Sequence, residues 1–153
     1  MEIRELTEQE IPAALTLAWQ VFEQFVAPGY PVEGVETFHR FLEEENRSRR
    51  LRMIGAVEGG RVVGLLAMRD SHISLFFVEK GRQRQGIGRS LLSYEQVHGS
   101  DRSLSVNAAP DASETYRRLG FRETDTEQLR DGIRYVPMVL ETACVRSEKG
   151  ALR

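Results

Sequence analysis

A loop that carries three arginines and three glycines lies between an apolar run and an amphipathic run, and these residue types could bind a phosphate group. Residues 73–78 are mostly apolar and typical of a β-strand, and the amphipathic run after the loop begins at Ile87. Gly86 and Gly88 lie where that helix would start. The first N–H groups of a helix lack an intrahelical acceptor, its dipole favours an anion, and glycine lets the backbone approach closely. The segment therefore predicts a phosphate site, with an ordinary strand-to-helix turn as the alternative.

Two common phosphate motifs do not fit this loop. A P-loop has Lys-Ser/Thr directly after its last glycine, but Arg89 and Ser90 follow Gly88 here. The dinucleotide fingerprint requires a third glycine where this chain has Leu91. Residues 83–88 instead match the pattern Q/R-x-x-G-x-G/A, which resembles the coenzyme A pyrophosphate loop of the GNAT superfamily of N-acetyltransferases.

A second match lies downstream, in residues 104–121. They predict a strand, a short helix and a stop at Gly120, and they are similar to the other half of the GNAT core, with a tyrosine shortly before Gly-Phe. The resemblance implies that Tyr116 protonates the leaving thiolate; the alternative is an aromatic side chain that packs a helix end. Many members carry Asn seven residues before this tyrosine, where this chain has Ala109, so one cofactor contact is in question. Asn107 is two residues away and is not given that role.

The resemblance also implies acetyl-CoA as co-substrate and no metal. The pantetheine arm would pair with the backbone of residues 76–78, and the pyrophosphate with N–H groups of residues 85–89, with two arginines as charge partners. The cofactor-binding residues expected on this basis are Phe76, Phe77, Val78, Gln83, Arg84, Gln85, Gly86, Ile87, Gly88, Arg89 and Ser90.

The incoming amine needs a base, because an amine with a pKa of about 10 is mostly protonated at pH 7. His72 and Glu79 flank the apolar strand, and histidine has the better matched pKa. A histidine at a strand start is also typical of a structural hydrogen bond. Glu23 and His39, in the N-terminal helices, are weaker candidates.

The acceptor pocket of the resembled fold is built from the first two helices and the terminal strands. This nominates five aromatic residues: Trp19, Phe22, Tyr30, Phe38 and Tyr135. Aromatics at helical spacing are also typical of a core, and the flanking Pro and Gly make Tyr30 the candidate lid.

Composition places these motifs in one small domain. The chain has 153 residues, 41% hydrophobic and 29% charged, as expected of a soluble globular protein. A net charge of −2 argues against a dedicated nucleic-acid binder, and the single cysteine, Cys144, excludes an internal disulfide and a cysteine zinc site. No apolar stretch reaches the length of a membrane span, and the first residues are typical of a strand and not of a signal peptide. We therefore expect a cytoplasmic protein, and a homodimer is left open.

The predicted elements follow the order of the GNAT fold. Residues 1–6 predict a strand, and a helix follows with one apolar stripe: Ile11, Leu15, Ala18, Phe22 and Phe25. Further expected elements are a helix over 35–45, a hairpin over 53–57 and 62–69, a strand over 73–78, a helix over 87–97, and strands near 121 and over 133–140. The predicted fold class is α/β (α+β): a single GNAT domain over residues 1–141, with a mixed, mostly antiparallel sheet flanked by helices and a polar tail over 142–153.

The predicted activity is an acetyl-CoA-dependent N-acetyltransferase. It would move an acyl group to a primary amine of a small molecule or peptide by direct attack in a ternary complex. The alternatives are a coenzyme A-binding sensor or interaction domain without turnover, and an acyltransferase for hydroxyl or thiol acceptors.

Overall fold

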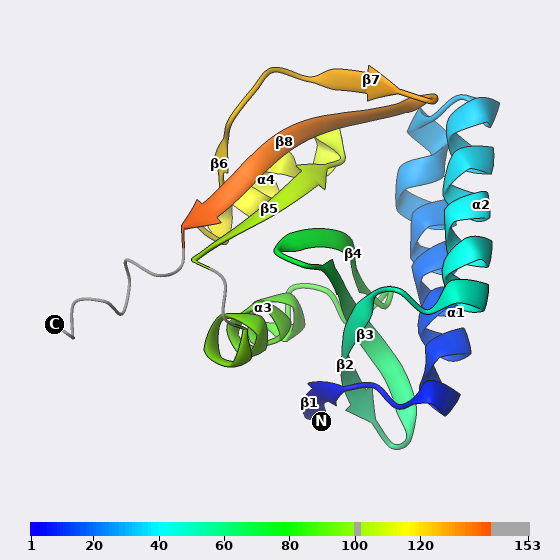
Figure 1. Cartoon of the computed structure of the whole chain (residues 1–153), viewed down its shortest axis with the longest axis vertical. Coiled ribbons are helices and arrows are strands. Elements are labelled where there is room, and N and C mark those ends of the chain that lie inside the picture. Colours follow the sequence, from blue (N-terminus) through cyan, green and yellow to red (C-terminus); the bar gives the residue numbers. More distant parts are fainter. Residues whose placement is uncertain (100–101, 142–153) are drawn as a thin grey trace, which may run out of the picture.

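The strands form one sheet in the order β1-β2-β3-β4-β5-β8-β6, and β7 pairs with β8 beside this path (Figure 1). The computed structural model describes residues 1–99 and 102–141, so the predicted tail over 142–153 and Cys144 lie outside the described residues. All strand pairs are antiparallel except β4 with β5, which confirms the predicted mixed sheet. The strands are β1 (Glu2–Glu5), β2 (Arg52–Glu58), β3 (Arg61–Arg69), β4 (His72–Val78), β5 (Ser103–Ala108), β6 (Arg122–Glu123), β7 (Gln128–Arg130) and β8 (Ile133–Glu141).

Helices cover both faces of the sheet, and each face has its own hydrophobic core. Helices α1 (Ile11–Val21) and α2 (Val32–Ser48) lie on one face, and α3 (Ile87–His98) lies on the other (Figure 1). The short helix α4 (Ser113–Arg118) follows β5, and its Tyr116 packs against the core on the α3 side.

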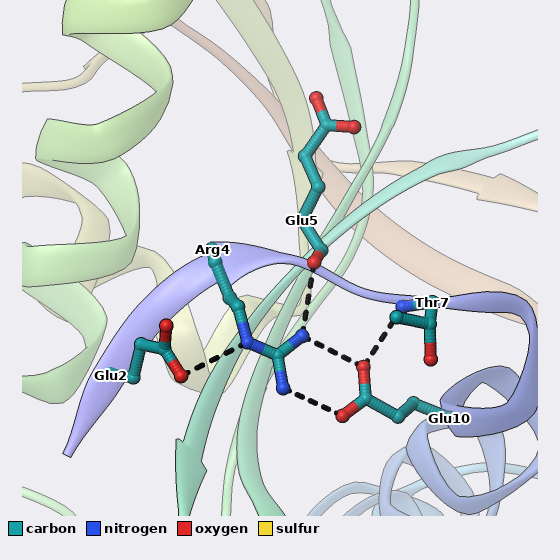
Figure 2. Close-up of polar contacts among 5 residues, drawn as sticks. All are labelled: Glu2, Arg4, Glu5, Thr7 and Glu10. Carbon is teal, nitrogen blue, oxygen red and sulfur yellow. Dashed lines mark hydrogen bonds and ion pairs between the residues drawn. The ribbon is translucent and has the colours of Figure 1, made fainter.

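Polar contacts fix the entry into α1, as Figure 2 shows. The Thr7 N–H donates to Oε1 of Glu10 at 2.8 Å, and two guanidinium nitrogens of Arg4 donate to the same carboxylate at 2.8 and 2.7 Å. The hydrogen bonds from Arg4 lower the pKa of Glu10 to about 2. The regular α-helix begins only at Ile11, because Pro12 prefers the first turn.

Strands β4 and β5 separate after two residue pairs. They pair in parallel only at His72 with Ser105 and at Ile73 with Val106. Ser74 is the extra residue of a β-bulge against β3, because Ile73 and Leu75 pair with consecutive β3 residues. From this bulge onward β4 has a free edge that faces β5.

The prediction that Phe25 belongs to the buried apolar stripe of the first helix is wrong. The chain changes to a π-helical turn over Phe22–Val26, which has a different number of residues per turn from the α-helix. Phe22 stays buried, but Phe25 is 48% exposed. The wider turn therefore removes Phe25 from the core stripe that the α-helical spacing predicted.

The turn between β7 and β8 contacts the start of α2 (Figure 1). Strand β7 was not predicted, because it has three residues and no clear apolar alternation. Gly34 of α2 lies against the backbone of Gly132, and the Thr37 hydroxyl bonds the carbonyl of Asp131 at 2.9 Å.

We expect Gly34→Ala to destabilise the protein, although alanine normally favours a helix. A Cβ at this position would lie 2.3 Å from the Gly132 carbonyl oxygen, so the helix or the turn must move. Such overpacking costs about 1–3 kcal/mol. Urea unfolding should show this loss. Gly29→Ala is the control, because nothing lies within 4 Å of its added Cβ; equal stability changes in the two variants would contradict the packing argument.

Candidate active site

A cavity of about 720 Å³ lies where β4 and β5 separate. Phe76, Phe77 and Val78 of β4 all line it. Phe76 and Val78 pack against the core on the α3 side, whereas Phe77 packs against the core on the α1–α2 side. The cavity therefore reaches both faces of the sheet through the gap between the two strands.

The α3 side of the cavity is formed by the glycine loop and α4. Gly86 is the residue before α3 and has a φ of +83°. The first helical hydrogen bond runs from the Ser90 N–H to the Gly86 carbonyl at 3.0 Å, so the N–H groups of residues 87–89 lack a helical acceptor. The lining residues here are Arg82, Gln83, Arg84, Gly86, Ile87, Gly88, Arg89, Thr115, Tyr116, Arg118 and Leu119.

Most of the expected cofactor residues lie together on this side. Of that set only Gln85 and Ser90 do not line the cavity; the Gln85 side chain bonds the Gly81 carbonyl at 3.4 Å, and Ser90 lies within α3. Arg82 and Arg118 line the cavity but were not predicted. Arg82 was within the predicted basic loop, and the charge of that loop was the signal that could have found it.

Tyr116 lines this side of the cavity. Its ring contacts Phe76 and Phe121, with ring centres 6.0 and 5.3 Å away. Its hydroxyl makes no hydrogen bond to any described residue, and burial raises the pKa of Tyr116. The phenol is therefore protonated at neutral pH and available as a donor.

The α1–α2 side of the cavity, which we call the acceptor side, has a different composition. Val21, Phe25, Val26, Gly29 and Tyr30 line it from the end of α1 and the segment after it, together with Asp111, Glu127 and Arg134. The Tyr30 hydroxyl donates to the Arg134 carbonyl at 3.0 Å, which joins this segment to β8. Burial and then the charge of Asp111 raise the pKa of Tyr30.

Sequence reasoning found Tyr30 on this side and missed its neighbours. Phe25 was taken for a core residue, and the two charged residues Glu127 and Arg134 come from strands and turns whose pairing no local pattern indicates.

Four of the five aromatics proposed for the acceptor pocket do not line the cavity. Phe22 and Phe38 stack with ring centres 4.1 Å apart, and Trp19 stacks on both at 5.9 and 6.5 Å. These three rings therefore belong to the core beneath the acceptor side. Tyr135 lies on β8 opposite Gln128 of β7.

The candidate bases also lie outside the cavity. His72 is at the closed end of the β4–β5 gap, where its Nδ1 lies 2.8 Å from the Ser105 hydroxyl, and burial, followed by the charge of Arg69, lowers its pKa. This contact fits the alternative interpretation of His72, a structural hydrogen bond at the strand start. Glu79 forms an ion pair with Arg61.

The other two candidate bases are also placed away from the cavity. Glu23 lies with Glu79 on a separate pocket of about 310 Å³. His39 is on α2, where its ring meets Trp19 edge-on at 5.0 Å between centres. Neither residue lines the cavity between β4 and β5.

Within the described part of the chain, no group of three His, Cys, Asp or Glu side chains could hold a metal ion. Over the same residues, each helix falls short of the length and apolar character that crossing a bilayer requires.

Comparison with known proteins identifies the class that this fold and cavity define. The family model described as "Acetyltransferase (GNAT) domain" matches residues 26–142, which is more than half of the chain. The chain therefore belongs to the GNAT acetyltransferase family, which confirms the predicted family, its fold and an acetyltransferase enzyme. The family uses acetyl-CoA.

Solved structures give the same fold. A GCN5-related N-acetyltransferase from Rhodopseudomonas palustris has a TM-score of 0.76 and 18% identity over 92% of this chain and 94% of that chain. A paiA N-acetyltransferase from Thermoplasma acidophilum in complex with coenzyme A has a TM-score of 0.68 and 19% identity over 92% and 98%. A ribosomal-protein-alanine N-acetyltransferase from Brucella melitensis has a TM-score of 0.61 and 25% identity over 92% and 99%. No curated protein matches the sequence.

Proposed function

We propose that this protein is an acetyl-CoA-dependent N-acetyltransferase that acts on a primary amine of a small molecule or peptide, with a domain over residues 1–141. The observation that carries the proposal is the cavity that reaches both faces of the sheet through the β4–β5 gap. A thioester and an amine can enter such a cavity from opposite faces and meet within it. This arrangement supports direct attack in a ternary complex.

The residues of the α3 side fit coenzyme A. The N–H groups of residues 87–89 and the loop arginines suit a pyrophosphate, because free helix N–H groups and positive charge both favour an anion. The free edge of β4 after Ser74 suits the amide groups of a pantetheine arm, which would bind as an added strand. Ala109, at the position that carries Asn in many members, also lines the cavity.

The thioester C–S bond of acetyl-CoA would break as the amine nitrogen forms the new amide bond. The proton that this nitrogen loses would pass to water, because none of the four candidate bases lines the cavity. Tyr116 would donate its phenolic proton to the sulfur that leaves. Its position in the cavity and its free hydroxyl support this role, and the raised pKa keeps the phenol protonated at neutral pH.

We expect acetyl-CoA to raise the melting temperature of the protein. A ligand that binds only the folded state adds about 2.7 kcal/mol at a hundredfold excess over its dissociation constant, or about 5–10 °C for a chain of this size. ATP and nicotinamide dinucleotides should give much smaller shifts in the same thermal denaturation assay. An equal shift with ATP would indicate a general nucleotide site and contradict the proposal.

Turnover separates an enzyme from a binding domain. Release of free thiol from acetyl-CoA should depend on an added amine in a panel of small amines and peptides. Binding without amine-dependent thiol release would favour the sensor interpretation. Turnover only with alcohols or thiols would identify an O- or S-acyltransferase.

A further inference from the structure

We propose that Asp111 and Phe25 make the acceptor side selective for a singly charged amine on an apolar, aryl-sized body. This inference rests on the proposed acetyltransferase function and names the substrate class of the same cavity. Asp111 would bind the ammonium group, and Phe25 would cover the apolar part.

Asp111 is the carboxylate that remains available on the acceptor side. Asp111 is exposed and makes no hydrogen bond or ion pair with another described residue, and its charge helps to raise the pKa of Tyr30. The other acidic residue of this side, Glu127, is neutralised by Arg134, whose guanidinium lies 3.2 Å from its carboxylate. The acceptor side therefore carries one carboxylate without an ion-pair partner among the described residues, that of Asp111, and one carboxylate suits one ammonium group.

The walls around Asp111 are apolar. Phe25 is 48% exposed and lines the cavity because of the π-helical turn, and Val26 lies beside it in the same turn. Val21 and Pro110 line the cavity as well. Covering an exposed aromatic ring with an apolar ligand is favourable, because it removes both surfaces from water.

The charge distribution disfavours polycationic acceptors. On the α3 side of the cavity, Arg84 and Arg89 form no ion pair with any described carboxylate, whereas Arg82, Arg118 and Arg134 are paired with Glu58, Glu114 and Glu127. A polyamine or an aminoglycoside would need several carboxylates for its ammonium groups and would approach these arginines. A simple arylalkylamine needs one carboxylate and gains from the apolar wall.

Asp111 also has a structural interpretation, since an acidic residue in the first turn of a helix interacts favourably with the helix dipole. Glu114 is the matched control for that interpretation. It lies in the first turn of α4, and it pairs with Arg117 and does not line the cavity.

The test is calorimetric titration of phenethylamine into protein saturated with coenzyme A, so that binding is measured without turnover. Asp111→Asn should weaken binding roughly 5-fold, as expected for the loss of an ion pair to an exposed carboxylate. Glu114→Gln should change it less than about threefold, and the matching alcohol, phenethyl alcohol, should bind weakly to all three proteins. Equal affinity in the parent and Asp111→Asn would overturn the role of Asp111.

Phe25→Ala tests the apolar part of the inference. In steady-state assays it should raise the KM for phenethylamine and leave the KM for ethylamine nearly unchanged. Leu129→Ala, an exposed apolar residue outside the cavity, is the control and should change neither. Preferred turnover of spermidine or of an alanine-starting peptide would overturn this substrate class while the acetyltransferase function stands. If the parent protein did not bind acetyl-CoA, the proposed function itself would be refuted.

Discussion

The Tyr116→Phe variant is expected to bind acetyl-CoA as the parent protein does and to turn it over roughly 10²–10⁴-fold more slowly. The substitution keeps the ring between Phe76 and Phe121 and removes only the hydroxyl, which bonds no described residue. The packing and the cofactor side should therefore be unchanged. A lower kcat with little change in the KM for acetyl-CoA would indicate an interaction made mainly in the transition state.

Tyr94→Phe is the matched control for Tyr116→Phe. Tyr94 is also partly buried against the α3-side core, but its ring stacks on His98 at 4.0 Å and does not line the cavity. Single-turnover rates should be measured, because slow product release would hide a slower chemical step. A Tyr116→Phe protein with parental single-turnover rates would show that the thiolate leaves unassisted and that Tyr116 only packs the helix end.

Local motifs were predicted well from the sequence because their chemistry depends on neighbours in the chain. The strand, loop and helix around Gly86 need only residues that are close in sequence, and the structure places them as predicted. Tyr116 follows the same rule, since its helix and the Gly-Phe pair after it are adjacent. Most residues that line the α3 side of the cavity could therefore be predicted, although Arg82 and Arg118 were missed.

The acceptor side could not be predicted because it depends on backbone geometry and distant contacts. The α-helical spacing placed Phe25 in the core, and a single π-helical turn moved it to the cavity. His72 was a candidate base because it begins β4, the strand that lines the cavity. Strands β4 and β5 separate only at Ser74, so His72 lies where the two strands are still paired. Tyr30 reaches β8 across more than a hundred residues of sequence, which no local pattern indicates.

A large loss of acetyl-CoA affinity is expected when Gly88 is replaced. Valine at this position should weaken acetyl-CoA binding by roughly 100-fold or more, which corresponds to about 2.7 kcal/mol, and should leave the fold intact. An added Cβ would meet only the Phe76 ring, at 3.6 Å, which is an ordinary contact. Gly88 and Phe76 both line the cavity, so a valine side chain at position 88 would fill space that the pyrophosphate and the pantetheine arm require.

Gly86→Val should also abolish the thermal shift with acetyl-CoA, but it will carry a stability cost. Gly86 has a φ of +83°, a conformation that a β-branched residue strongly disfavours. Gly60→Val is the matched control, because Gly60 has a φ of +78° in the open turn between β2 and β3, away from the cavity. Both variants should lose similar stability, and only Gly86→Val should lose the response to acetyl-CoA. If Gly86→Val and Gly88→Val both bound coenzyme A as tightly as the parent protein, added side chains at these two positions would not obstruct the phosphates. The phosphates would then have to bind elsewhere on the protein.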